Sequence, residues 1–427
     1  MGHAGYVLES DGVALLVDPW LTGTAFDDGW APTTDPVVPD LDSVTHVWLS
    51  HEHPDHFSPK SLELVPEARR ADVTVLHQRT RDGRVVAWLR KAGFAVRECD
   101  PGEDVRLGPA TTARVVPWSS GDSLLAVQAD GTTVVNLNDA VIPNPRAAQR
   151  ARALLGGGAA DVLLTQFGYA NRVGNPDQPE LRRREAEHKL HALQCQGRAF
   201  GARWVVPCAS HIWFCHEENA YMNDEQQTAA RAVAAAGEVG DAVMLAPGDR
   251  WAVGDAIDPT AAAARYDADF RARVEGSPLV PAKEPLPVDE LEALAAAFVE
   301  RLRERNGEKV IGAMVRAGVL RTATVELSDL DDVVTLTPTG LRRGGGEVAA
   351  DVRLSSRALA FALRHEFGGA TLQVNARYTA PAGGELGRFR RYLMLSNLNT
   401  RGLTVLRPGA AVREKVRHTV WARWPSR

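Results

Sequence analysis

The stretch HVWLSHEHPDHFSP, residues 46–59, holds four of the twelve histidines of this 427-residue chain. An apolar, strand-like run comes first and the polar run HEHPDH follows at once, so His51, His53, Asp55 and His56 are expected at a strand end and in the loop behind it. His51 and His53 are two residues apart, which in an extended backbone turns both imidazoles to one side. Imidazole with carboxylate suits zinc, iron or manganese, and so dense a set can hold two ions close together. The stretch therefore predicts a dinuclear metal site, with a polar surface loop as the alternative.

The composition is that of an ordinary globular protein, with 44% hydrophobic and 24% charged residues and a net charge of −5. An acidic balance argues against nucleic-acid binding, which normally needs a basic surface. No apolar run reaches the length of a membrane span, and the N-terminus MGHAGYVLES lacks the regions of a secretion signal. The four scattered cysteines suggest no disulfide framework. We therefore expect a cytoplasmic protein that acts on a small molecule, without nucleic-acid or membrane partners.

The sequence pattern divides the chain into three parts. Residues 1–257 begin with short β-branched runs, of which the first two are joined by SDG and predict a β-hairpin, and continue with alternating strands and amphipathic helices. We expect an α/β metal-binding catalytic domain there. Residues 258–285 are rich in Ala and Pro and are expected to be a connecting segment. Residues 286–427 open on a strongly amphipathic helix and continue in strand-like runs, which predicts a separate α+β domain.

The spacing HxHxDH is the signature of the metallo-β-lactamase superfamily, which this chain resembles. The segments GHAGYVLESDGVALLVDPWLTGTAFDDGW and VVPCASHIWFCHEENAYMND are similar to those of the CMP-N-acetylneuraminate hydroxylase group, and the resemblance covers residues 2–225. It implies an αββα sandwich with the metal site at one edge between the sheets. In the C-terminal part, DVRLSSRALAFALRHEF is similar to a sterol-carrier-type segment.

Two further acidic positions are candidate ligands. Asp139 ends the strand-like run TVVNLND, where a carboxylate with two oxygens can bridge two cations; capping of the next element is the alternative. Superfamily hydrolases carry a histidine ligand before the bridging aspartate, yet no histidine lies between His77 and His188. Asp122 in WSSGDS is the nearest competent group, and its oxygen ligands would favour iron or manganese over zinc. The alternative is that Asp122 is a turn residue after Gly121.

The last metal ligand and the substrate pocket are predicted from the remaining motifs. In VVPCASHIWFCHEEN, the strand-like run favours His211 by geometry, whereas the resemblance matches His216, which we prefer. The long loop after LLVDPWL carries Trp20, Phe26 and Trp30. We expect this loop to be exposed, to overhang the site and to line the substrate pocket, because an exposed loop with three aromatic residues has little other reason to keep them.

Two chemistries compete on this scaffold. A non-haem diiron oxygenase that hydroxylates or N-oxygenates a small or carrier-linked substrate is favoured by Asp122 and by the hydroxylase-like segments. A dizinc hydrolase acting on an ester, thioester, lactone or amide is the alternative, and a non-catalytic metal-containing binding module is the second alternative. Asp55 and Asp139 are the expected catalytic carboxylates. The sialic acid hydroxylases carry a Rieske module ahead of this region, whereas Gly2 and His3 open the resemblance here, so an oxygenase would take electrons from a separate donor protein or from a reductant.

Overall fold

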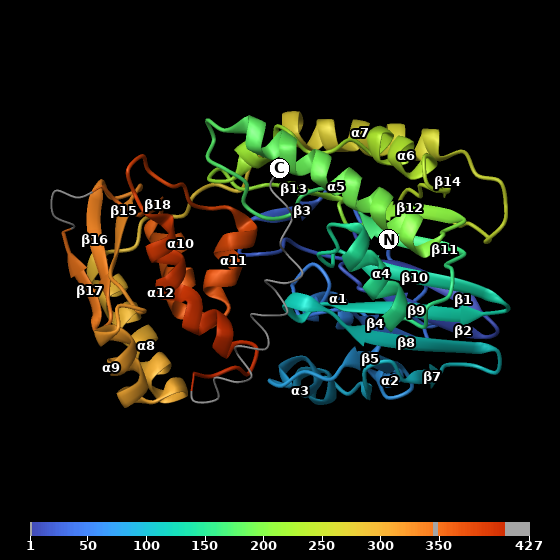
Figure 1. Ribbon diagram of the computed structural model, residues 1–427, viewed down its shortest axis with the longest axis horizontal. Helices are drawn as coiled ribbons and strands as arrows, with labels where there is room; N and C mark the ends of the chain where they lie inside the picture. Colours follow the sequence, from blue (N-terminus) through green and yellow to red (C-terminus); the bar gives the residue numbers. More distant parts are fainter. Residues whose placement is uncertain (1, 345–348, 406–427) are drawn as a thin grey trace.

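The computed structural model describes residues 2–344 and 349–405 and has two lobes (Figure 1). The first lobe, coloured blue to yellow, contains two stacked sheets with helices outside them. The second lobe, coloured orange to red, contains a smaller sheet and its own helices. No helix in the described ranges combines the length and the apolar character that crossing a membrane requires.

Two sheets lie face to face in the first lobe. The five-stranded sheet has the order β1 (Tyr6–Ser10), β2 (Val13–Val17), β4 (His46–Leu49), β5 (Thr74–Gln78), β6 (Ala95–Cys99). The seven-stranded sheet has the order β14 (Asp241–Ala242), β12 (Trp204–Cys208), β11 (Val162–Gln166), β10 (Thr132–Asn138), β9 (Ser123–Ala129), β8 (Thr111–Pro117), β7 (Asp104–Arg106). Apolar side chains of both sheets, such as Leu15, Trp48, Val115 and Val206, form one core between them. Their burial holds the two sheets together.

The β-hairpin predicted at the start of the chain is confirmed. Strands β1 and β2 pair antiparallel across Asp11 and Gly12, whose φ angles are 50° and 74°. Two positive φ angles in a two-residue loop are typical of a type I′ turn, whose twist matches that of the strands. A small second ribbon pairs β3 (Trp30–Pro32) with β13 (Ile212–Phe214).

Helices cover the outer face of each sheet and complete an αββα sandwich, as predicted (Figure 1). The seven-stranded sheet is covered by α4 (Pro145–Leu154), α5 (Pro179–Phe200), α6 (Ala229–Gly237), α7 (Pro259–Gly276). The five-stranded sheet is covered by α1 (Pro59–Leu62), α2 (Glu67–Arg70), α3 (Arg84–Lys91). Two short 3₁₀ helices, η1 (Ser119–Gly121) and η2 (Ala220–Asn223), complete the lobe.

The segment predicted to connect the domains, residues 258–285, is only partly a connection. Its first two-thirds form α7, which packs beside α6 and places Ala263 and Tyr266 in the core under the seven-stranded sheet. The Tyr266 hydroxyl donates to the carbonyl of Ser210 at 2.8 Å. The Ala-rich composition of this stretch therefore belongs to a packed helix, and the irregular link begins after Gly276.

The second lobe has a core of its own. Its sheet has the order β17 (Gly340–Arg343), β16 (Asp332–Thr337), β15 (Ala323–Leu327), β18 (Val352–Leu354). The helices of this lobe are α8 (Val288–Asn306), α9 (Glu308–Arg316), α10 (Ser356–Arg364), α11 (Gly368–Asn375), α12 (Leu386–Asn399). Leu291, Phe298, Val325, Leu359 and Tyr392 are among the buried residues that these elements share. The α+β architecture is the one that the sequence pattern predicts.

The two lobes are joined by buried polar contacts. The Arg377 guanidinium donates to Asp27 Oδ2 at 2.8 Å and to Glu218 Oε2 at 2.5 Å, and its side chain is only 5% exposed. The Asn219 amide donates to the carbonyl of Asn375 at 2.8 Å. These bonds fix the second lobe against the loop that follows β2 and against the segment that follows β13.

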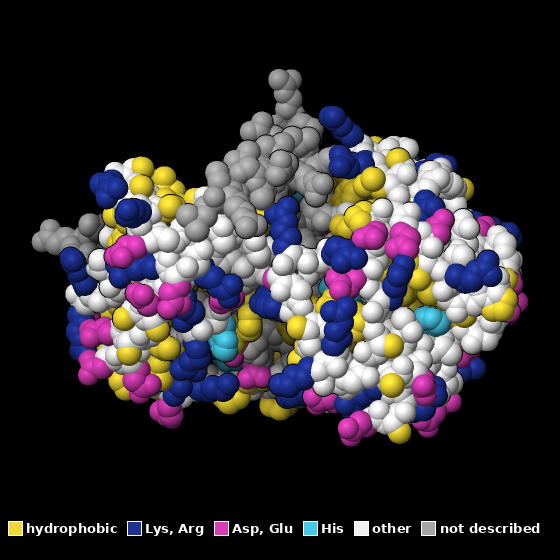
Figure 2. All heavy atoms as spheres, turned by 90° about the horizontal axis from the view of Figure 1, so that it is seen from below, with side chains coloured by type: hydrophobic (Ala, Val, Ile, Leu, Met, Phe, Trp, Pro, Cys, Tyr) yellow, Lys and Arg dark blue, Asp and Glu magenta, His cyan; other side chains and the backbone are white. Residues whose placement is uncertain are grey.

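A second contact crosses the boundary between the lobes. Arg84 Nη2 donates to the carbonyl of Thr400 at 2.8 Å and also pairs with Glu52. Figure 2 shows one face of the molecule, on which Lys and Arg side chains lie on both sides of this boundary.

Candidate metal centre

The ends of parallel strands meet at one edge of the sandwich, and the candidate ligands follow these ends. Strands β2 and β4 run parallel in one sheet, and β10, β11 and β12 run parallel in the other. Asp18 follows β2, His51 follows β4 by two residues, and Asp139 follows β10 directly. Carboxyl ends of neighbouring parallel strands gather at the same edge of a sheet, where sites typically form.

His51 and His53 lie side by side at this edge. His51 Nε2 is 2.9 Å from His53 Nδ1, and the two ring centroids are 4.5 Å apart. His51 Nδ1 is 2.9 Å from the hydroxyl of Ser50, so Nε2 is the nitrogen that faces the neighbouring ligands. Burial lowers the pKa of His51 to about 3 and also lowers the pKa of His53. Both imidazoles are therefore neutral near pH 7, the form that binds metals.

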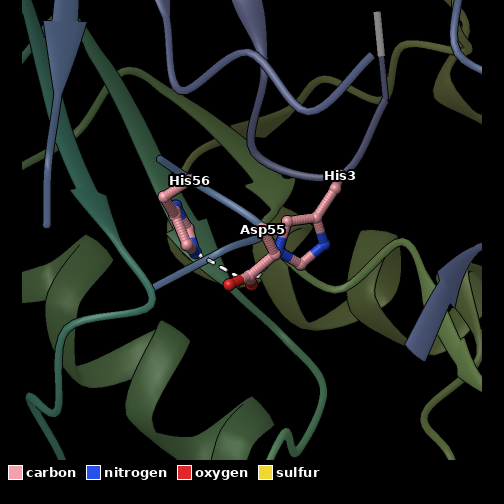
Figure 3. A group of neighbouring side chains, drawn as sticks. All are labelled: His3, Asp55 and His56. Atoms are coloured by element: carbon pink, nitrogen blue, oxygen red, sulfur yellow. Dashed lines mark ion pairs between the residues drawn. The ribbon is translucent and has the colours of Figure 1, made fainter. Parts of the chain in front are cut away.

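A second group forms around Asp55, whose carboxylate lies between the rings of His3 and His56 (Figure 3). Asp55 Oδ2 is 3.1 Å from His3 Nε2 and 3.1 Å from His56 Nε2. All three residues are buried, with Asp55 at 2% exposure. Burial acts to raise the pKa of Asp55, but His56 and His3 hold it well below its usual range.

Asp139 lies between the two groups. Its Oδ2 is 3.8 Å from His51 Nε2 and 3.7 Å from His56 Nε2. Burial acts to raise the pKa of Asp139, but the opposite effect of His51 and His56 is larger and lowers this pKa below its usual value. The carboxylate is thus placed where it reaches both the histidine pair and the Asp55 group.

Asp18 and Asn138 hold His56 from behind. Asp18 Oδ2 is 3.0 Å from His56 Nδ1, and it accepts bonds from the Ser50 hydroxyl at 2.7 Å and from the Asn138 amide at 2.6 Å. A carboxylate on one imidazole nitrogen fixes the ring and leaves the other nitrogen, Nε2, for a metal. Burial acts to lower the pKa of His56, but the carboxylates of Asp55, Asp139 and Asp18 raise it well above its usual value.

Several donor atoms of this centre are buried without a hydrogen bond among the described residues. They are both ring nitrogens of His3, Asp55 Oδ1, His56 Nε2 and Asp139 Oδ1; the Nε2 atoms of His3 and His56 form ion pairs with Asp55 without hydrogen-bond geometry. Buried polar atoms normally have hydrogen-bond partners, and a set of them without partners lowers the stability of the folded state. In the described part of the chain, the ion-pair partners of Asp18, Asp55 and Asp139 are all histidines. The residues therefore fit cations bound among them.

Asp122 lies next to this centre in the structure. It is 6% exposed and follows η1, and burial, together with the charge of Asp139, raises its pKa well above its usual value. The adjacent Ser123 hydroxyl donates to the carbonyl of Ser50 at 2.6 Å, which anchors this segment at the end of β4. Asp122 is therefore a buried carboxyl within the electrostatic reach of Asp139.

The structure brings neither His211 nor His216 into the two groups. The His211 ring packs 4.6 Å from Tyr266, and burial lowers its pKa to about 3. His216 Nδ1 is 3.6 Å from Glu218, on the side of the second lobe. After β12 the chain reaches this edge through the Ala209 amide, which donates to the His3 carbonyl at 3.1 Å. The histidine that lies beside Asp55 there is His3.

The aromatic loop is not exposed, so that prediction was wrong. Trp20, Phe26 and Trp30 are 1%, 4% and 2% exposed and form one buried cluster with residues of both lobes. They pack directly behind the centre: the Trp20 ring is 5.7 Å from His3, and the Phe26 ring is 5.5 Å from His53. Their apolar surface is covered by segments that are distant in the sequence, from Tyr169 and Phe214 of the first lobe to Val374 of the second. Local sequence pattern does not indicate these contacts.

Backbone strain gathers around the same edge. His3, Asp18, Asn138 and Ala209 have φ angles of 48°, 36°, 54° and 49°, and Phe26 has 56°. Positive φ costs free energy in residues with a Cβ atom, and it persists where surrounding structure enforces it, often at functional sites. The centre is thus held in a fixed conformation by its supporting bonds.

Sequence reasoning missed His3, Asp18 and Asn138. Asp18 carried a detectable signal, because it directly follows the apolar run VALLV just as Asp139 follows TVVNLN. His3 had no comparable signal, since it precedes the first strand and meets Asp55 only through the tertiary fold.

Comparison with known proteins finds similarity in the part of the chain that carries this centre. A family model described as a beta-lactamase superfamily domain matches residues 1–165. A protein of Mycolicibacterium smegmatis, named as a Rieske 2Fe-2S iron-sulfur protein, is 29% identical over an alignment of 255 residues, and the match covers 53% of this chain and 45% of that protein. This chain spans about half the length of that relative.

Two shorter matches are to proteins that are named for an enzymatic activity. The cytidine monophosphate-N-acetylneuraminic acid hydroxylase of Danio rerio is 34% identical over 95 residues, 21% of this chain and 16% of the relative. A metal-dependent hydrolase of Agrobacterium fabrum is 31% identical over 98 residues, 22% of this chain and 35% of the relative. Together with the αββα sandwich and the HxHxDH spacing, these matches confirm the resemblance: residues 1–165 match a beta-lactamase superfamily domain, and the domain that they begin has the metallo-β-lactamase fold.

Proposed function

We propose that this centre binds two metal ions and that the protein is a dinuclear metal-dependent enzyme. The observation that carries the proposal is the set of buried donor atoms without hydrogen bonds, which converge from His3, Asp55, His56 and Asp139. His51 and His53, with Asp139, would hold one ion. His3, Asp55 and His56 would hold the other, with Asp139 reaching both.

The oxygenase is the favoured chemistry. Bound iron would supply redox chemistry toward dioxygen, whereas bound zinc would supply Lewis-acid activation of water. Asp122 supports iron, because its buried carboxyl lies within electrostatic reach of Asp139, and an oxygen ligand there would be harder than the imidazole that the hydrolases use. The similarity to a sialic acid hydroxylase supports hydroxylation or N-oxygenation of a small or carrier-linked substrate.

In this proposal the roles of the protein groups follow from their contacts. Asp18 orients His56 through the 3.0 Å contact at Nδ1, so the ring cannot turn away from the centre. Asp55 and Asp139 both face His56 Nε2, at 3.1 and 3.7 Å, and are the proposed catalytic carboxylates. Electrons would come from a separate donor, in keeping with a relative named as a Rieske iron–sulfur protein.

The dizinc hydrolase is the second candidate, and the similarity to a metal-dependent hydrolase favours it. It uses the same ligands but requires no electron donor. Incubation with ester, thioester, lactone and amide substrates, with and without a chemical reductant and dioxygen, separates the two. Dioxygen uptake that depends on reductant supports the oxygenase, and turnover without either supports the hydrolase.

The metal site itself is tested by substitution. We expect His53→Ala to lower the metal content by about one ion per chain, because it removes one of the two neighbouring imidazoles. His191→Ala is the control, since His191 lies exposed on α5, where its ring contacts Cys195. Equal metal content in both variants and in the unchanged protein would contradict the assignment.

A further inference from the structure

We propose that a cavity at the boundary of the two lobes binds an oxyanion group, phosphate or carboxylate, of the substrate. This inference rests on the proposed function and adds a substrate class to it. The cavity has a volume of about 460 Å³ and is lined by residues 171–174, by Leu181, Arg184, Glu185 and His188 of α5, and by Arg390 of α12. Both lobes therefore contribute to it.

The charge of the lining is positive and is not neutralised by the protein. The lining contains three arginines, Arg172, Arg184 and Arg390, and a single acidic side chain, Glu185. This excess of positive charge occurs in a chain whose net charge is −5. None of the three arginines has an ion-pair partner among the described residues. By contrast, the neighbours of Arg184 on α5 are paired, Arg182 with Asp224 and Arg183 with Glu225. Unpaired guanidinium groups that converge on one cavity are suited to bind an oxyanion through two parallel bonds.

Tyr378 positions two of these arginines. The Arg172 guanidinium lies over the Tyr378 ring, 4.6 Å from its centroid, and Arg172 Nε donates to the Tyr378 carbonyl at 3.0 Å. The Tyr378 hydroxyl accepts from Arg390 Nη2 at 3.3 Å and donates to Gln373 at 2.7 Å. One aromatic residue of the second lobe therefore places charges from both lobes side by side.

The wall of the cavity is fixed before any ligand binds. Arg182 Nη1 donates to the carbonyls of Val173 and Asn175, at 3.3 and 2.6 Å. The Asn175 amide donates to the carbonyl of Ala380 at 2.8 Å, and the Ala380 amide donates back to Asn175 at 2.9 Å. A preformed site loses less conformational entropy on binding, so it binds more tightly than mobile surface arginines would.

Helix α5 links this cavity to the candidate metal centre. Glu185 lines the cavity, and Lys189 follows one helical turn later. Lys189 Nζ donates to Gln166 at 2.7 Å, at the end of β11, and it lies within the electrostatic reach of Asp139 and Asp122. A molecule anchored by its oxyanion in the cavity would therefore extend along α5 toward the metal centre.

Titration calorimetry at low ionic strength, with inorganic pyrophosphate and with succinate as probes, tests the proposal. Arg184→Ala and Arg390→Ala should each raise the dissociation constant of the more tightly bound probe about tenfold, because each removes a charge-assisted hydrogen bond. Arg184→Lys should recover part of the loss. Arg183→Ala is the matched control on the same helix, since its side chain pairs with Glu225 instead, and it should bind as the unchanged protein does.

The outcomes distinguish a phosphate from a carboxylate as the group that the cavity binds. A preference for pyrophosphate indicates a phosphate-bearing substrate, and a preference for succinate indicates a carboxylate. No binding of either probe, or binding that Arg184→Ala and Arg390→Ala leave unchanged, overturns the proposal, since the anion would then bind elsewhere, including at a metal. Metal content, measured on the same samples, reports on the proposed metal centre independently, so each proposal can fail without the other.

Discussion

Replacement of Arg377 by Met should loosen the second lobe from the first. The side chain of Arg377 is 5% exposed and pairs with Asp27 and Glu218, whose side chains are 21% and 19% exposed. Breaking a buried ion pair by removing one partner costs about 3–5 kcal/mol, because a charge is left without compensation. Here the two carboxylates regain part of their hydration, so we expect a loss of about 2–4 kcal/mol. Met keeps much of the apolar part of the Arg377 side chain, so the loss of stability measures the contribution of the guanidinium charge.

Urea unfolding followed by tryptophan fluorescence and by circular dichroism measures this loss. Two probes are needed because a two-lobed chain need not unfold in one step. Arg353→Met is the control: Arg353 also lies in the second lobe and pairs with Glu326, but the two side chains are 50% and 37% exposed. We expect the control to lose less than about 1 kcal/mol. Equal unfolding midpoints for the two variants would refute the reasoning.

The same contact supports the metal centre. Arg377 also donates to the carbonyl of Asp27 at 2.9 Å, within a run in which Phe26, Asp27 and Asp28 have φ angles of 56°, 55° and 60°. Three successive residues in this strained region need outside support. Since the Phe26 ring contacts His53, Arg377→Met should also speed metal loss to a chelator.

Three other substitutions test separate parts of the account. Phe26→Ala should cost about 3–5 kcal/mol in urea unfolding, because a buried aromatic side chain is lost; an unchanged midpoint would restore the exposed-loop prediction. Asp18→Asn should weaken metal affinity about 10–100-fold by removing the carboxylate behind His56, and chelator competition measures this against Asp35→Asn, an exposed control. Asp122→His should keep two metals, shift the preference toward zinc and lose dioxygen-dependent activity; native metal content and turnover in that variant would count against Asp122 as a ligand.

The sequence predicted those parts of the centre that are local along the chain. His51, His53, Asp55 and His56 fall within six residues, and their placement behind a buried strand follows from the apolar run before them. Asp139 was found by the same reasoning, because it follows an apolar strand. Strand ends and short spacings are set by backbone geometry, which sequence pattern reports well.

Parts that depend on packing between distant segments could not be predicted. His3 meets Asp55 across more than fifty residues, and no periodicity connects them. Trp20 and Phe26 are buried by segments far away in the sequence, such as those of Phe214 and Val374, so a loop that is polar overall was taken as exposed. Likewise, α7 is rich in Ala, and its buried residues are Ala263 and Tyr266. So few buried side chains give only a weak helical pattern in the sequence.

The metal content of the purified chain tests the central claim most directly. Elemental analysis of protein prepared without added metal, from cells grown with both iron and zinc, gives the number and the identity of bound ions. The account predicts two ions per chain, with iron predominant, and a loss of both after His51→Ala combined with Asp55→Ala. Two zinc ions would keep the dinuclear centre and contradict the oxygenase, and a chain without bound metal, which also fails to take up iron or zinc on reconstitution, would contradict the centre itself.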